Sequence, residues 1–169
     1  MLFRSSDPYV REQSVLGHDC SLTYGSLLSR ATTLAGHLTD HALPEPVSLN
    51  VTTSYGDSTV TAQLRGTTVP GIAGDLIAWA DTLSVVTVEA WRPSERDRVH
   101  LSIMGTLTGS AGAVELKVFG AVADDPHWFA DLQPDPCQGI SLALGQLRTW
   151  AANPSIPDTP LLPTPRAQR

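Results

Sequence analysis

The chain has few charged residues, few cysteines and no long apolar run. Charged residues make up 17% of the 169 residues, below the average of about 25% for globular proteins. The net charge is −6, which disfavours attraction to nucleic acid or to an anionic membrane. No run approaches the length of a membrane span. We therefore expect neither a nucleic-acid partner nor a membrane partner.

The two cysteines, Cys20 and Cys137, are too few for a disulfide framework. One bridge between them is possible, but two reduced thiols in a cytoplasmic protein are the favoured interpretation. Residues 1–23 are too polar for the apolar region of a signal peptide. The chain has no Walker A motif, no Rossmann glycine pattern and no CxxC pair, so we expect no cofactor and no structural metal.

The length suits one domain with one core. Residues 1–20 show little periodicity and are expected to form an N-terminal arm. Residues 153–169 are rich in proline and are expected to form an extended or disordered tail. A single α+β domain is therefore expected over residues 21–152.

Apolar residues recur at helical spacing from Leu27 to Ala42, which predicts a first helix. Ser21 or Thr23 can cap its start, and Pro44 can stop it. Residues 48–64 then alternate apolar and polar side chains around Gly56-Asp57, which predicts a hairpin. The apolar positions of the helix are Leu27, Leu28, Ala31, Leu34, Ala35, Leu38 and Ala42.

A second helix is expected from Pro70 to Leu83, with Thr67 or Thr68 as its cap. Three β-rich runs, 85–91, 99–103 and 114–122, predict an antiparallel meander. Residues 140–150 predict a third helix. The expected order is α-ββ-α-βββ-α, a five-stranded, mostly antiparallel sheet with helices packed on one face and a Thr/Ser-rich outer face.

His37 and His41 stand one helical turn apart with Asp40 between them. This spacing can place two imidazoles on one metal. However, no HExxH pattern is present, and a third ligand would have to come from His18, Asp19 or Cys20 in the N-terminal arm. A solvated helix face is the favoured interpretation.

Residues 123–139 form the densest chemical cluster of the chain. Asp124, Asp125, His127 and Asp131 could supply acid and base groups, with Trp128 as a hydrophobic wall. The packing alternative is that Asp-Pro starts a turn whose aromatics plug the end of the sheet. We favour packing, because no nucleophile or glycine-rich oxyanion turn accompanies the cluster.

Two further residues near the third helix have a functional and a structural interpretation. Cys137 could be activated by the helix N-terminus, but a lone cysteine is more often inert. Ser141 is expected to be an N-cap, because the GxSxG elbow is absent. The order α-βββ-α matches a double-stranded-RNA-binding domain, but Arg148 is the only cation in the last helix.

Three stretches carry a resemblance: residues 38–46 (LTDHALPEP), 78–83 (AWADTL) and 146–152 (QLRTWAA). They resemble small α+β proteins of high-GC actinobacterial genomes that have no known activity. The resemblance therefore implies a cytoplasmic home but brings no catalytic residues.

The sequence favours a non-catalytic protein-interaction module, which binds a protein partner or a second copy of itself through an open sheet edge. The alternative is a small enzyme or ligand-binding domain with its site in the 123–139 loop.

Overall fold

The computed structural model describes residues 20–54, 57–93, 97–109, 112–130, 132 and 139–153. The expected N-terminal arm and Pro-rich tail therefore lie outside the described residues, apart from Cys20 and Asn153. Asp131 and Cys137 also lie outside them. None of the helices in the described part is long and apolar enough to cross a membrane.

The described strands form one six-stranded mixed sheet in the order β1-β2-β5-β4-β3-β6. Every pairing is antiparallel except β2–β5, which is parallel. The expectation of five strands is corrected by β6. The strands are β1 (Ser48–Ser54), β2 (Asp57–Gln63), β3 (Ser84–Trp91), β4 (Arg98–Gly109), β5 (Gly112–Ala123) and β6 (Gly139–Leu142).

The β1–β2 hairpin and the β3-β4-β5 meander confirm the alternation seen in the sequence. On β5, Val114, Leu116, Val118 and Val122 are buried while Glu115 is exposed, because side chains alternate across a strand. At the start of β5, Gly112 has φ +105°. Glycine suits this position because a left-handed φ is unfavourable for residues with a Cβ.

Helix α2 (Val69–Ala80) starts as the sequence predicts. Thr68 is the N-cap, and its Oγ1 accepts a hydrogen bond from the Gly71 amide at 3.3 Å. Pro70 lies in the first turn, where its missing N–H costs no hydrogen bond. Helix α2 ends at Ala80, before Leu83, which is half-buried beyond it.

Helix α1 (Cys20–His41) begins earlier than expected. Ser21 and Thr23 therefore lie inside the helix and do not cap it, which corrects the sequence expectation. The helix ends at His41, and Ala42 then adopts φ 48°. A left-handed residue just past the last turn is a common helix terminator, here followed by Pro44.

The expected helix over 140–150 is two elements, which is a second correction. Residues Gly139–Leu142 form β6 and pair with β3, and α4 (Leu144–Ala151) follows. Ile140 and Leu142 lie opposite Ala90 and Val88, so their alternation fits a strand against the open edge of β3. Ser141 is consequently in β6 and does not cap α4, whose N-cap is Ala143.

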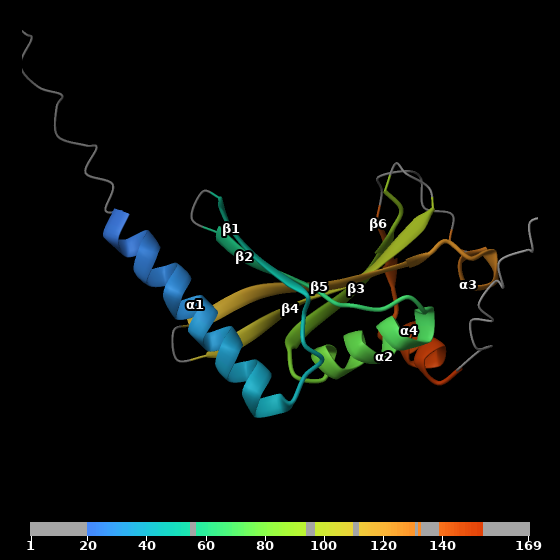
Figure 1. Cartoon of the computed structure of the whole chain (residues 1–169), viewed down its shortest axis with the longest axis horizontal. Helices are drawn as coiled ribbons and strands as arrows, with labels where there is room; N and C mark the ends of the chain where they lie inside the picture. The colour runs from blue at the N-terminus through green and yellow to red at the C-terminus, as the bar shows by residue number, and fades with distance from the viewer. Residues whose placement is uncertain are drawn as a thin grey trace, which may run out of the picture.

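The helices cover one face of the sheet, and α2 and α4 lie side by side beneath it (Figure 1). Helix α1 lies at the other end of the sheet from the short helix α3 (Pro126–Phe129) (Figure 1). The core between the layers contains Trp79, Leu76 and Ile72 of α2, all fully buried. A Cβ on Gly120 would lie 2.5 Å from Ile72 Cδ1, so this glycine lets α2 pack closely on β5.

Candidate functional site

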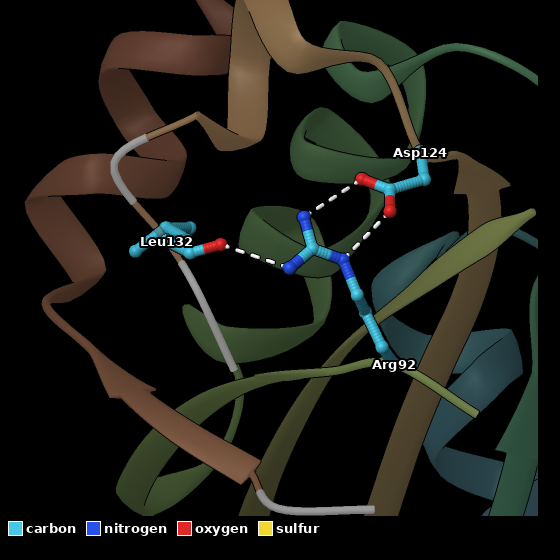
Figure 2. A network of polar contacts seen from close by, with 3 residues as sticks. All are labelled: Arg92, Asp124 and Leu132. Carbon is cyan, nitrogen blue, oxygen red and sulfur yellow. Dashed lines mark hydrogen bonds and ion pairs between the residues drawn. The ribbon is translucent and has the colours of Figure 1, made fainter. Parts of the chain in front are cut away.

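The loop after β5 is held by a clamp between Arg92 and Asp124 (Figure 2). Arg92 Nε donates to Asp124 Oδ2 at 2.6 Å, and an Nη donates to Oδ1 at 2.9 Å. The other Nη donates to the carbonyl oxygen of Leu132 at 3.1 Å. Both side chains are 19% exposed. This bidentate, charge-assisted pair ties the end of β3 to the loop.

The other members of the sequence cluster have separate positions. Asp125 caps α3, and its Oδ1 accepts from the His127 amide at 2.8 Å. The His127 side chain is exposed, and its ring meets that of Trp128 at 5.1 Å. Asp131 lies outside the described residues. The Asp124 carboxylate is thus engaged by Arg92, and it forms no hydrogen bond with His127 among the described contacts.

The aromatics of this loop pack onto α4. Phe129 is buried, and its ring meets Trp150 edge-to-face at 5.6 Å. Trp128 is half-buried and lies 6.4 Å from Trp150. These contacts match the packing interpretation of the loop, in which the aromatics close the end of the core.

The His37–His41 pair borders a hollow of about 620 Å³ between α1 and the end of β4. The two rings lie 4.4 Å apart. His37 Nε2 lies 2.9 Å from Thr82 Oγ1, and that hydroxyl donates its proton to the Trp79 carbonyl. His37 Nε2 must therefore be the donor to Thr82.

The His37 pKa lies below its ordinary value, first because of burial and then because of His41, while Asp40 opposes the shift. His37 thus joins α1 to the end of α2 and is half-buried, where the sequence favoured a solvated face. Among the residues that the structure describes, no group of three or more His, Cys, Asp or Glu side chains could hold a metal ion.

An aromatic row crosses the outer face of the sheet, opposite the helices. Trp91 and His100 face each other across β3 and β4 with ring centroids 4.5 Å apart. Phe119 of β5 stacks on the other side of His100 at 5.6 Å and 14°. Burial lowers the His100 pKa, with Arg98 and Lys117 adding to the effect. Within the described region, His100 Nδ1 is a buried side-chain atom without a hydrogen-bond partner.

This row could not be read from the sequence. The outward direction of His100 follows from the alternation of β4, but its neighbours depend on the register of three strands. The expected Thr/Ser-rich outer face is therefore correct for β2, with Thr59 and Thr61, but not for the middle of the sheet.

In the part of the chain that the structure describes, a surface beside α1 and β1 combines an unpaired strand edge with exposed apolar side chains. We define this α1–β1 surface by Ala31, Ala35 and Leu38 of α1, the strand β1, and Val47 just before it. Val47 and Leu49 are 47% and 51% exposed. Leu28, which is 69% exposed, lines the hollow between α1 and β4. Between α1 and β1 lies a cleft of about 130 Å³, lined by apolar side chains apart from Arg30.

The chain matches no protein-family model, no curated protein and no solved structure. Its function must therefore be argued from its own residues.

Proposed function

We propose that this protein is a protein-interaction module that binds its partner at the α1–β1 surface. The observation that carries the proposal is the edge of β1, which no described strand pairs with, which is uncharged, and which lies beside exposed apolar side chains. We further place the protein in the cytoplasm, as its cysteine content suggests.

Strand β1 lacks the features that usually protect a sheet edge. Its seven residues, Ser48–Ser54, include no charged residue and no proline. Its register with β2 runs without a shift along the whole strand. Natural edge strands are commonly blunted by lysine, proline, bulges or short length. At the other edge, β6 is only four residues long. The β1 edge is therefore the one suited to accept a strand.

The apolar side chains beside β1 support binding of a protein. Among the described residues, the large hydrophobic side chains that are exposed are Leu28, Val47, Leu49 and Val85. Two of these four, Val47 and Leu49, are neighbours on the α1–β1 surface. Single exposed apolar residues are normal in proteins, but a cluster of them marks an interaction surface.

The expected partner segment is extended and has alternating apolar side chains. Its backbone would pair with the unpaired N–H and C=O groups of β1. Alternate side chains of an added strand point to one face of the sheet. On the inner face they would meet the cleft between Leu38 of α1 and Val51 of β1.

The alternative, an enzyme or ligand site in the 123–139 loop, has less support. Asp124 and Asp125 hold the loop through Arg92 and the α3 cap. Phe129 closes the core. The described members of the cluster thus have structural contacts, and no acid–base pair is formed between them.

Site-specific photo-crosslinking tests the proposed surface. A photoreactive amino acid replaces Asn50, which is exposed on β1, and in a matched control it replaces Ser141, which is exposed on the other edge strand. In the cells that make the protein, we expect a protein crosslink from position 50 and none from position 141. Crosslinks from position 141 alone, or from neither position, would overturn the proposal.

A further inference from the structure

We infer that the partner at the α1–β1 surface is a second copy of this chain, related by a twofold axis beside β1. The inference rests on the proposed function, because it names the occupant of the same surface. It joins two observations: an apolar stripe on α1 that the described residues leave largely exposed, and an edge strand that can pair with itself.

The stripe on α1 has the spacing of a helix–helix seam. Leu28, Ala31, Ala35 and Leu38 follow one another at intervals of three, four and three residues. This is the a/d pattern by which two helices pack along a shared seam. Within the described part of α1, Leu34 is the buried hydrophobic residue, while Ala31 and Ala35 are exposed and Leu38 is half-buried. Within the described residues, the seam is thus formed but left largely exposed.

Strand β1 is suited to symmetric pairing. In an antiparallel pair centred on Val51, Leu49 lies opposite Thr53 of the second copy, and Asn50 lies opposite Thr52. Like charges directly opposite one another destabilise a sheet. The segment from Val47 to Ser54 contains no ionisable side chain, so this pairing creates no such contact.

The overall charge also favours this surface for self-association. Two copies that each carry −6 repel one another. A contact between copies is therefore most favourable where the surface is uncharged. The edge of β1 and the stripe of α1 meet that condition together.

A single twofold axis can bring both β1 and the α1 stripe into the contact between copies. Helix α1 and β1 border the same cleft on the inner face of the sheet. An axis perpendicular to the sheet beside β1 brings the two β1 strands together and the two α1 stripes toward each other. A twofold interface uses the same patch on both subunits. The result is one continuous sheet with both clefts covered.

The mass of the full chain in solution tests the inference. By light scattering after size exclusion, we expect about twice 18.0 kDa. Ala35→Arg places a long cation in the seam and should weaken association at least about tenfold, giving 18.0 kDa. Its matched control is Thr32→Arg, which is exposed on α1 outside the seam and should stay dimeric. Both variants reduce the net negative charge, so added general repulsion cannot explain a loss.

A pair of double variants tests the strand register. Asn50→Lys with Thr52→Lys sets lysine opposite lysine across the axis, and the dimer should dissociate. Asn50→Glu with Thr52→Lys sets opposite charges there, and the dimer should persist. Their neighbours on β2, Thr61 and Thr59, are uncharged, so both variants should fold alike, which circular dichroism checks.

The outcomes distinguish failure of the inference from failure of the proposed function. The native chain could have a mass of 18.0 kDa and crosslink through position 50 to another protein. That result would overturn the inference of a second copy and would leave the proposed function supported. A dimer that Ala35→Arg leaves intact overturns the inference. A dimer that both strand variants preserve but Ala35→Arg dissociates overturns the symmetric strand pairing. A dimer without any crosslink at position 50 overturns the inference and the function together.

Discussion

Helices α1 and α2 cover the same face of one sheet but differ in how completely they are themselves covered. Helix α2 buries Val69, Ile72, Ala73, Leu76, Trp79 and Ala80, and α4 packs at its side. Helix α1 is longer, yet Leu34 is its buried hydrophobic residue among those whose side chains are described. The difference shows that an apolar stripe can be present in the sequence while the described core buries only part of it.

The two helices therefore draw stability from different sources. Helix α2 is fixed by tertiary packing, including a hydrogen bond from Trp79 Nε1 to the Pro44 carbonyl at 3.3 Å. Helical propensity alone stabilises an isolated helix only marginally. Helix α1 is held by the buried Leu34 and by the hydrogen bond between His37 and Thr82. The proposed second copy would supply further packing contacts.

The strongest test of this contrast shortens one leucine on each helix. Leu76→Ala removes a fully buried side chain and should cost about 2–5 kcal/mol of unfolding free energy. Leu28→Ala removes a side chain that is 69% exposed and should change the monomer by no more than about 0.5 kcal/mol. Urea unfolding at low protein concentration measures both. Similar losses of unfolding free energy for the two variants would show that the side chains of α1 are packed as tightly as those of α2.

A second test compares two ion pairs near the well-packed end. Arg92→Met leaves the half-buried Asp124 carboxylate without its bidentate partner and should cost about 1–3 kcal/mol. Arg148→Met breaks the pair with Asp81, whose side chains are 60% and 59% exposed, and should cost less than about 1 kcal/mol. Thermal or urea unfolding measures the loss of stability in each of the two variants. Equal losses would mean that the clamp shown in Figure 2 does not fix the loop.

The smallest expected effect is a dependence of stability on pH. The pKa values of His37 and His100 are lowered from 6.5 in the folded chain, mainly by burial. The unfolded chain therefore takes up protons first as the pH falls through 6.5, and folding stability decreases. His100→Phe should weaken this decrease and keep the ring stack with Trp91 and Phe119.

His37→Phe provides the comparison for this pH test. It should also weaken the decrease, but it removes the bond to Thr82, so it should cost stability at neutral pH as well. Urea unfolding between pH 5 and pH 8 measures both variants (about the range in which histidines titrate). If the free energy of unfolding of the native chain did not decrease as the pH was lowered from 6.5, this account would be contradicted.

Local patterns made much of the fold predictable. The hairpin, the meander and the Thr68 cap all depend on residues close together in the chain, so alternation and cap chemistry are sufficient to find them. The start of the last helix was wrong because Gly139–Leu142 fits a helical pattern and a strand equally well. Its assignment depends on the open edge of β3, which is distant in sequence.

The position of the proposed α1–β1 surface does not follow from the sequence alone. An open sheet edge follows from the expected topology, but which strand forms it depends on the β2–β5 pairing. The periodicity of α1 predicted one apolar face. How much of that face remains uncovered depends on how α1 lies on the sheet, and that arrangement is not encoded in any local pattern.

The parallel pairing of β2 with β5 has a consequence for the order of folding. Val60 pairs with Leu116 across a long stretch of chain, whereas β3, β4 and β5 pair with their immediate neighbours through short connections. Closing a long loop loses more chain entropy than closing a short one. We therefore expect the meander to form first and to act as the template on which the N-terminal helix and hairpin dock late.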